Sequence, residues 1–343
     1  MKNKKKIILY IFYISITIAF LIFILSMNDI GDIFQILQHA DIKYILISLL
    51  LVLIYLGMYP LTLCILSKAK KVNVSNKYIY SIGMSEHFFN GITPFATGGQ
   101  PFQIYALSKK KVDLSTSTGL LMMNFIIHMC ASNLFALISL FFFNRFATST
   151  SMKILAIVGF SMNFLVLVLM VSLATSKTLK HFILWVLSKL AKIKFLHKLI
   201  TEKMIDIENY IENTQNSFKE LWHNKKSFIT CFIIRFLTLS IYYAVPFYIL
   251  KSLHMEISYA NLFISMCASS FAITMCVFLP TPGSSGGIEY AFSNIFASLV
   301  VSMTSSTSYC GMLIWRLLTY YLPVLISFLF YLYFEISKKE EKI

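Results

Sequence analysis

Ionisable side chains inside long apolar stretches are the residues of this sequence that could do chemistry. The ones that stand out are Glu86, His87, His128, Arg235, Glu289 and Arg316. An ionisable group at membrane depth is costly unless it is paired, so each marks a candidate site. Glu289 and Arg316 are the strongest candidates because both lie away from lysine-rich ends of their stretches. A guanidinium offers a fixed fork of donors to phosphate oxygens, and a carboxylate can serve as its counter-ion or receive a cationic group.

The other ionisable residues have simpler alternative interpretations. His128 is more readily a hydrogen-bonded interior histidine than a proton carrier, and Arg235 could reach lipid headgroups from near the end of its stretch. Glu86 and His87 could lie at the membrane interface if their segment is shallow. The sequence contains no HExxH, Walker, GxGxxG or GxSxG pattern. We therefore predict no catalytic residues, no metal and no cofactor.

Two segments interrupt the apolar pattern in the same way. Residues 94–99 read Pro-Phe-Ala-Thr-Gly-Gly, and residues 282–287 read Pro-Gly-Ser-Ser-Gly-Gly. A polar residue follows each one, Gln100 in the first case and Glu289 in the second. Paired Gly/Pro interruptions point to a binding site, because a broken helix presents free N–H groups to anions and glycine lets a ligand approach the backbone. We predict an internal repeat whose two breaks face each other across a polar cavity.

Helices must position these residues, since long apolar runs make up most of the chain. Of 343 residues, 57% are hydrophobic and only 13% are charged, which is too little polar surface for a soluble domain. The runs long enough to cross a bilayer are residues 7–27, 44–66, 116–143, 152–174, 227–250, 258–280 and 309–334. The predicted fold class is all-α and polytopic, with about seven to eight transmembrane helices of roughly 20 residues. We expect one integral membrane domain over residues 1–343, with two broken segments that could re-enter.

Lysines set the predicted topology. The formal charge is +15, and most lysines lie between the apolar runs, which the positive-inside rule explains without nucleic acid. This pattern predicts a multi-pass cell-membrane protein with both termini in the cytoplasm. Lysines flank residues 78–107 on both sides, so this segment is expected to enter and return to one face; the alternative is a cytosolic loop with a short helix. Residues 287–303 could cross or re-enter, because the loop at 302–308 carries no charge.

The largest polar stretch, residues 175–226, is predicted to be a basic, amphipathic cytoplasmic loop. Within it, residues 179–200 interleave aromatic and aliphatic residues with lysines, which suits a helix lying on an anionic leaflet. A solvated linker is the alternative for part of this region. The six cysteines form no CxxC pair, and we predict buried, reduced thiols.

Three stretches carry a resemblance to a known family. They read Phe-Phe-Asn-Gly-Ile-Thr-Pro-Phe-Ala-Thr-Gly-Gly-Gln-Pro at residues 88–101, Leu-Pro-Thr-Pro-Gly followed by Gly-Gly-Ile-Glu at 279–289, and Trp-Arg-Leu-Leu-Thr-Tyr-Tyr-Leu-Pro at 315–323. In these stretches and their order along nearly the whole chain, the sequence resembles the transmembrane region of lysylphosphatidylglycerol synthase, the multiple peptide resistance factor, and its stand-alone relatives. Family members with a known role move aminoacylated phosphatidylglycerol between leaflets. Full-length synthases add a cytosolic domain that transfers lysine from charged tRNA to the lipid, which we do not expect here because the chain stops at Ile343.

The resemblance implies a flippase-like protein whose partners are membrane phospholipids. Its substrate would be an anionic or aminoacylated phospholipid such as lysylphosphatidylglycerol, or a polyprenyl-phosphate-linked lipid. The alternative is the membrane part of a phosphatidylglycerol lysyltransferase system, working with a separate soluble transferase subunit in lipid modification and resistance to cationic antimicrobial peptides. Many relatives carry arginine where this chain has Gln103, a departure that argues against phosphate binding there. The predicted head-group site consists of Glu86, His87, Asn90, Pro94, Gly98, Gly99, Gln100, Gln103, Pro282, Gly283, Gly286, Gly287, Glu289, Arg316 and Tyr320.

Overall fold

Helices make up the regular structure in the part of the chain that is described. The structure is a computed structural model, and it describes residues 35–300 and 303–340. Helical segments long and apolar enough to cross a membrane are Ile42–Ala69, Leu114–Phe146, Thr150–Thr175, Lys225–Ser252, Tyr259–Cys276 and Ser305–Tyr333. They correspond to the predicted apolar runs from residue 44 onward and confirm an all-α polytopic fold. The predicted run at residues 7–27 lies outside the described residues.

In chain order the main helices are α3 (Ile42–Met58), α4 (Leu61–Ala69), α5 (Asn76–Met84), α6 (Glu86–Gly91), α7 (Gly99–Lys109), α8 (Leu114–Ser139), α9 (Phe143–Phe146), α10 (Thr150–Thr175), α11 (Lys177–Leu190), α12 (Lys194–His223), α13 (Lys225–Ser252), α14 (Leu262–Cys276), α15 (Gly287–Ala297), α16 (Ser305–Arg316) and α17 (Leu322–Glu340). Two 3₁₀ turns, η1 (Pro94–Ala96) and η4 (Pro282–Ser284), form the breaks. A π-helical turn, η5 (Leu317–Tyr321), joins α16 to α17.

Polar side chains fix where several of the long helices begin. Asp41, Ser149 and Asn224 accept hydrogen bonds from backbone N–H groups in the first turns of α3, α10 and α13. Asp113 does the same for α8, accepting from the N–H groups of Ser115 and Thr116. The hydrogen bond from the Ser115 hydroxyl is the main cause of a lowered pKa for the Asp113 carboxyl. Each cap satisfies N–H groups that have no partner within the helix.

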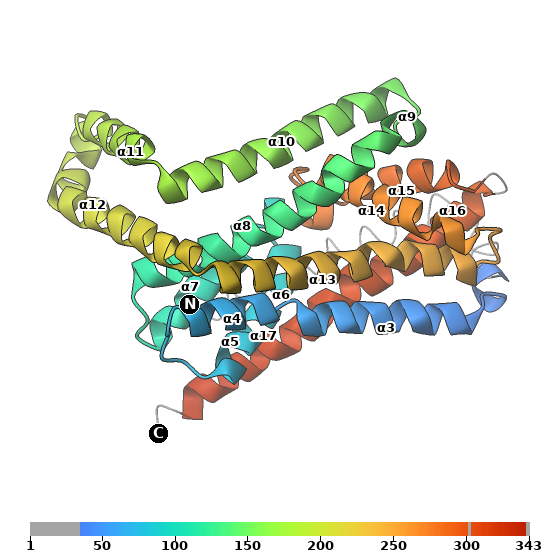
Figure 1. Ribbon diagram of the computed structural model, residues 1–343, viewed down its shortest axis with the longest axis horizontal. Helices are drawn as coiled ribbons and strands as arrows, with labels where there is room; N and C mark the ends of the chain where they lie inside the picture. Colours follow the sequence, from blue (N-terminus) through green and yellow to red (C-terminus); the bar gives the residue numbers. More distant parts are fainter. Residues whose placement is uncertain (1–34, 301–302, 341–343) are drawn as a thin grey trace.

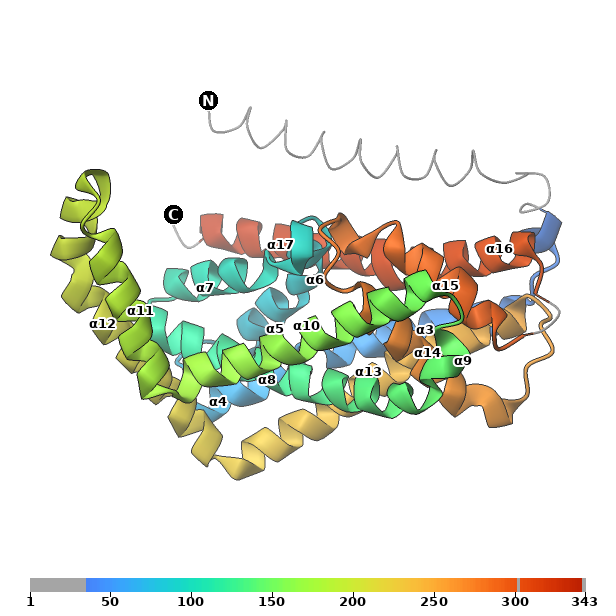
Figure 2. The same ribbon diagram turned by 90° about the horizontal axis from the view of Figure 1, so that it is seen from above.

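The segment between α4 and α8 forms a hairpin that turns back inside the bundle. α5 and α6 run inward, η1 is at the tip, and α7 runs outward again (Figure 2). The Tyr78 hydroxyl at the start of α5 donates a 2.8 Å hydrogen bond to the carbonyl of Ala106 near the end of α7. The two arms therefore start and finish at the same end of the molecule. This is the re-entrant arrangement predicted for residues 78–107, and Phe88 on the inward arm is buried.

A second hairpin, α14–η4–α15, follows the same plan from the other end. Tyr259 lies just before α14, and Lys251 lies at the end of α13. The Lys251 ammonium is over the Tyr259 ring, 4.5 Å from its centroid. Thr304, just before α16, lines a cavity together with His254. Both ends of the hairpin thus lie beside the end of α13. α15 has 11 residues, about 16 Å of helix, which is too short to cross roughly 30 Å of hydrocarbon. Residues 287–297 therefore return rather than cross.

The two hairpins enter from opposite ends and meet at their tips. The N–H of Asp41, which precedes α3, donates a 2.7 Å hydrogen bond to the carbonyl of Ser252 at the end of α13. α3 and α4 then lead away to the end where the first hairpin starts. η1 and η4 contact each other midway (Figure 2).

The predicted internal repeat is visible in the backbone of the two tips. Phe95 has φ 56° and ψ 17°, and Gly283, in the matching position, has φ 60° and ψ 22°. The next residues, Ala96 and Ser284, are also left-handed, with φ of 51° and 55°. Three of these four residues carry a Cβ and are strained in this conformation.

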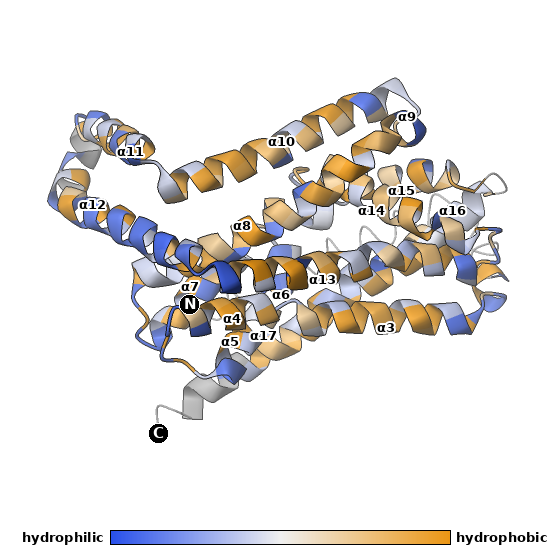
Figure 3. Cartoon of the chain, viewed as in Figure 1, coloured by the Kyte–Doolittle hydropathy of each residue, from blue (hydrophilic) through white to orange (hydrophobic). Residues whose placement is uncertain are grey.

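α11 and α12 extend from the end of the molecule where the first hairpin starts (Figure 1), and hydrophilic residues predominate on α12 (Figure 3). α12 crosses α8 closely, since a Cβ added to Gly119 would lie 2.7 Å from Ser217 Cβ. Lys180 Nζ on α11 lies 2.8 Å from Glu212 Oε2 on α12, and this hydrogen bond lowers the pKa of Glu212. Phe182 on α11 stays exposed, as expected for an amphipathic helix. The side of the membrane on which this region lies stays a prediction.

Candidate functional site

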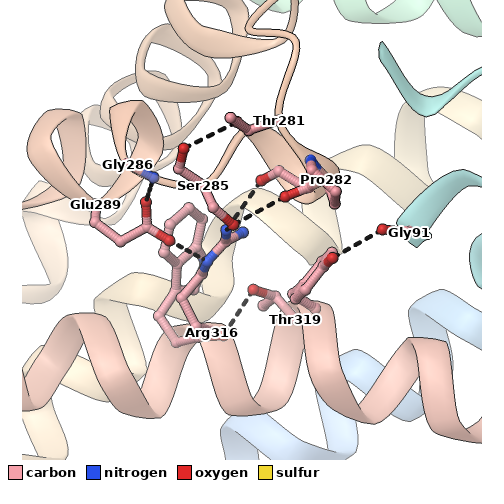
Figure 4. A network of polar contacts seen from close by, with 11 residues as sticks. Gly91, Thr281, Pro282, Ser285, Gly286, Glu289, Arg316 and Thr319 are labelled. Carbon is pink, nitrogen blue, oxygen red and sulfur yellow. Dashed lines mark hydrogen bonds and ion pairs between the residues drawn. The ribbon is translucent and has the colours of Figure 1, made fainter. Parts of the chain in front are cut away.

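An ion pair between Glu289 and Arg316 lies beside the second break (Figure 4). Arg316 Nε is 2.7 Å from Glu289 Oε1, and only 5% and 10% of the two side chains are exposed. Arg316 Nη2 also donates to the Gly283 carbonyl at 2.9 Å and to Ser285 Oγ at 3.0 Å. The other oxygen of Glu289, Oε2, accepts from the Gly286 N–H at 2.6 Å. The sequence predicted that each buried charge would need a partner. Glu289 and Arg316 are each other's partner.

Glu289 reaches Arg316 because the second hairpin turns back. In a plain antiparallel pair of crossing helices, a residue at the start of α15 and a residue at the end of α16 would lie at different depths. Arg316, at the end of α16, donates to the Gly283 carbonyl in η4, so α15 starts level with the junction between α16 and α17. The break at η4 therefore explains both why α15 is short and why Glu289 can pair with Arg316.

Tyr320 links the second half of the chain to the first break. Its hydroxyl donates a 2.8 Å hydrogen bond to the carbonyl of Gly91, and its ring lies 4.6 Å from the Arg316 guanidinium, measured to the centroid. A Cβ added to Gly283 would lie 2.3 Å from the edge of this ring. Gly283 therefore lets the backbone of η4 touch the ring, and glycine adopts this positive φ without the strain that a Cβ would add.

A cavity of about 180 Å³ lies where the two breaks meet. His87, Asn90 and Gly91 from the first hairpin line it, as do Gly283 and Tyr320 from the second half of the chain. The two breaks therefore lie beside one cavity, as predicted, but most of its lining is apolar rather than polar.

Beside the first break, the buried carboxylate of Glu86 accepts several hydrogen bonds. Glu86 is 7% exposed. Glu86 Oε1 accepts from the Tyr59 hydroxyl at 3.2 Å and from Asn90 Nδ2 at 3.4 Å, and Oε2 accepts from Gln103 Nε2 at 3.0 Å. Asn90 Oδ1 in turn accepts from the Gly99 N–H at 2.8 Å. Glu86 is therefore buried inside the protein, and its depth in the membrane stays a prediction. Gln103 bonds to Glu86 rather than lining the cavity.

Other predicted site residues lie at the breaks without lining the cavity. Glu289 and Arg316 are among them, which corrects the prediction that both would line it. Pro94 is exposed, and the Gly98 N–H donates to Thr93 Oγ1 at 2.9 Å. Gln100 is half-buried in the first turn of α7. Gly287 packs against Leu279, which lies 2.0 Å from where a Cβ would be. Pro282 accepts a 2.8 Å hydrogen bond from Ser285 Oγ through its carbonyl.

Arg235 is buried rather than reaching the headgroups, which corrects one of its two predicted interpretations. It is 1% exposed, and its Nη2 donates to Thr62 Oγ1 at 2.6 Å and to Asn124 Oδ1 at 3.3 Å. Its guanidinium lies 4.1 Å from the centroid of the Tyr59 ring. The side chain therefore faces the interior, where α13 packs against α4 and α8.

Sequence reasoning missed several aromatic and hydroxyl residues near the breaks. Tyr55, Tyr242 and Thr319 line the cavity with the predicted residues. Tyrosines inside apolar runs look like ordinary core residues, so no local signal singles them out. Among the described residues, no cluster of His, Cys, Asp and Glu could hold a metal ion. The cysteines are free thiols, as predicted, but Cys64 and Cys130 are half-buried rather than buried.

Comparison with known proteins then gives the family. A model described as the lysylphosphatidylglycerol synthase transmembrane region matches residues 10–327. The chain belongs to this family. It is also 22% identical over 318 residues to an Archaeoglobus fulgidus protein described as a UPF0104 membrane protein, covering 90% of this chain and 91% of that one. Both breaks and the Glu289–Arg316 pair fall within the part that matches the lysylphosphatidylglycerol synthase transmembrane-region family, which confirms the resemblance seen in the sequence.

Proposed function

We propose that this protein moves an anionic or aminoacylated phospholipid between the leaflets of the cell membrane. The head group would pass through the cavity between η1 and η4 while the acyl chains stay in lipid. The observation that carries the proposal is the Glu289–Arg316 pair, held beside the point where two oppositely directed hairpins meet. A site reached by hairpins from both ends is suited to exposing one ligand to each side in turn.

The chemistry of the pair favours a head group with both charges. Separating a buried ion pair is costly, because each charge is left without a partner in a low-dielectric site. An aminoacylated phospholipid could compensate both, its phosphate taking Arg316 and its ammonium taking Glu289. A simple anionic lipid offers only the phosphate, but Glu289 would keep its hydrogen bond from the Gly286 N–H. The arrangement therefore supports both substrates and favours the aminoacylated one.

A transport assay with the reconstituted full chain tests the proposal. Vesicles would contain phosphatidylglycerol or lysylphosphatidylglycerol with a fluorophore on one acyl chain, and a membrane-impermeant reductant would bleach the outer leaflet. Protein-free vesicles should lose about half of their fluorescence, since only one leaflet is reachable. Vesicles with the protein should lose nearly all of it. Equal bleaching with and without protein, for both lipids, would contradict the proposal.

A further inference from the structure

Glu86 and Gln103 are a buried pair of side chains with one hydrogen bond missing. Gln103 on α7 is 1% exposed, and its Nε2 donates to Glu86 Oε2 at 3.0 Å. Its other amide atom, Oε1, is buried and has no hydrogen-bond partner. Buried acceptors are normally hydrogen-bonded, so an unpaired one beside a carboxyl group needs an explanation. A proton on Glu86 would supply the missing donor, because a neutral carboxyl group carries one O–H.

The side chain of Gln103 suits both protonation states of Glu86. With Glu86 ionised, Gln103 Nε2 donates to it, as the structure shows. With Glu86 neutral, a half-turn of the amide about its terminal bond brings Oε1 to the carboxyl group, and the Glu86 O–H donates to it instead. Because the amide holds a donor and an acceptor side by side, the pair keeps one hydrogen bond when the proton binds and when it leaves.

Glu289 at the second break has the opposite arrangement. Arg316 Nε lies 2.7 Å from its Oε1 and supplies a permanent positive charge. Glu86 forms no ion pair with any described residue and accepts instead from neutral groups on Tyr59, Asn90 and Gln103. A buried carboxyl group without a paired counter-charge is costly to ionise. Of the two carboxyl groups at the breaks, Glu86 is therefore the one suited to gain and lose a proton.

The charged group closest to this site acts from a distance. The Arg235 guanidinium of α13 lies 4.1 Å from the centroid of the Tyr59 ring, and the Tyr59 hydroxyl donates to Glu86 Oε1. This charge offsets part of the cost of an ionised Glu86 without contacting it. The 3₁₀ turns η1 and η4 contain no titratable side chain. The other titratable side chains on elements around α6 are His87, Tyr55 of α3, Tyr78 and Tyr80 of α5, Tyr105 and Lys109 of α7, His128 of α8, and Tyr320 and Tyr331 near and in α17.

Two cavities give a proton a way to and from Glu86. A cavity of about 220 Å³ is lined by Tyr59, His87 and His128, and it has room for several water molecules of roughly 30 Å³ each. His87 Nε2 and His128 Nδ1 are buried without a partner, as expected for atoms that bind water. The Tyr59 hydroxyl can pass its proton to Glu86 Oε1 while its oxygen takes one from this water, so one proton moves from water to Glu86. His87 and Asn90 also line the cavity at the breaks, which offers release on the other side.

A proton on Glu86 would be felt at the tip of the first hairpin. Asn90 Nδ2 donates to Glu86 Oε1 at 3.4 Å, and Asn90 Oδ1 accepts from the Gly99 N–H at 2.8 Å, where α7 begins. The arms are packed so closely that a Cβ on Gly99 would lie 2.6 Å from Glu86 Cγ. Replacing an accepting oxygen with an O–H therefore changes the contact between α6 and α7. The turn η1 joins these two helices and contacts η4.

We infer that Glu86 binds and releases one proton in each transport cycle, so that a proton gradient drives lipid movement. Gln103 accepts the O–H of neutral Glu86 and donates to the ionised form. The coupling to lipid rests on the proposed function, whereas proton binding at Glu86 does not.

Infrared difference spectroscopy of the detergent-purified full chain tests the proton site without any transport. The probe is the C=O stretch of a neutral, buried carboxyl group, followed while the pH is lowered. We expect this band in the unaltered protein and not in Glu86→Gln. It should also be absent from Gln103→Arg, where an arginine would pair with Glu86 as Arg316 pairs with Glu289. Glu202→Gln and Ser108→Arg, at exposed positions of α12 and α7, should keep the band.

The two altered proteins guard each other against misfolding. Gln103→Arg keeps the carboxyl group that Glu86→Gln removes, so loss of the band from both, at melting temperatures close to that of the unaltered protein, assigns it to Glu86. A band that persists in Glu86→Gln, or in a folded Gln103→Arg protein, would overturn the inference. So would the absence of the band from the unaltered protein.

A pH difference across reconstituted vesicles tests the coupling. With the membrane potential clamped and a difference of one pH unit, one proton per lipid should shift the leaflet ratio of labelled lysylphosphatidylglycerol by up to about tenfold. The first, fast phase of bleaching gives this ratio, and a protonophore should return it to about one. Glu86→Gln and Gln103→Arg should show no shift, whereas Ser108→Arg should behave like the unaltered protein.

The outcomes separate the two proposals. A leaflet ratio that ignores the pH difference, in vesicles where the protein does move lipid, would overturn the coupling and leave the proposed function standing. No lipid movement in any vesicle, together with a carboxyl band that depends on Glu86, would overturn the proposed function and leave the proton site standing.

Discussion

Glu289 has two partners, and the loss of its charge should therefore be costly. Its carboxylate pairs with Arg316 and accepts from the Gly286 N–H at the start of α15. Glu289→Gln leaves a buried guanidinium without a counter-charge, and we expect a loss of about 3–5 kcal/mol in stability. Arg316→Gln should cost less, because Glu289 keeps the Gly286 hydrogen bond. Chemical unfolding of the purified variants in detergent measures both.

The double variant Glu289→Gln/Arg316→Gln completes the cycle. It leaves two neutral amides in place of the ion pair, so its loss should be smaller than the sum of the two single losses. Single losses that simply add would show that the two charges do not stabilise each other.

Gly283 and Gly286 offer a matched pair of substitutions at the second break. Both have positive φ, 60° and 92°, but a Cβ at Gly283 meets the Tyr320 ring at 2.3 Å, whereas nothing lies within 4 Å of one at Gly286. Backbone strain alone should cost about 1–3 kcal/mol at each site. Gly283→Ala should lower the melting temperature further, since it also displaces Tyr320 from Gly91. Equal melting temperatures would show that the contact between the η4 backbone and the Tyr320 ring contributes nothing.

At the scale of helices, the crossing of α8 and α12 depends on Gly119. A Cβ there would lie 2.7 Å from Ser217 Cβ and 2.9 Å from the Thr214 carbonyl oxygen, so Gly119→Ala should force α12 away and cost about 1–3 kcal/mol. Gly57 in α3 is the control, because its added Cβ would meet only Tyr80 Oη at 3.9 Å. Gly57→Ala should be neutral or stabilising by up to about 1 kcal/mol. Thermal unfolding of the two variants side by side gives the comparison.

The helices themselves were largely predictable, whereas the course of the second hairpin was not. Residues 78–107 carry breakers between two lysine clusters, so charge and composition both indicated a return to one face. Residues 258–280 look like an ordinary crossing, and the uncharged loop after residue 301 gave no topological signal. The contact between η4 and η1, which residue spacing does not give, is what shows the turn. Likewise, the pairing of Glu289 with Arg316 depends on the depth of α15, which residue spacing does not give.

The sequence could not identify the tyrosines and the arginine that pack near the breaks, and the reason is different. Tyr55, Tyr59 and Tyr242 lie in apolar runs, where a tyrosine is normally part of the core. Arg235 has no acidic residue nearby in the sequence, and its contacts with Thr62 and Asn124 come from distant helices. Only the packing of α13 against α4 and α8 brings these residues together.

For the whole molecule, the lysine distribution predicts which end faces the cytoplasm. The end of α4, both ends of the first hairpin, and α11–α12 lie together at one end (Figures 1 and 2), and this end carries the basic loops. Reporter fusions after Lys111, Lys198 and Lys339 should therefore all give a cytoplasmic signal. An external signal at Lys198 would reverse the placement of α11–α12.

The central claim is that a lipid head group crosses between the two breaks with Arg316 holding its phosphate. The most direct measurement is leaflet-resolved transport of labelled lysylphosphatidylglycerol in vesicles carrying equal amounts of unaltered protein, Arg316→Gln or Arg145→Gln. The account predicts complete bleaching for the unaltered protein and Arg145→Gln, and only about half for Arg316→Gln, in which a single leaflet is reachable. Full transport by a folded Arg316→Gln protein would contradict it.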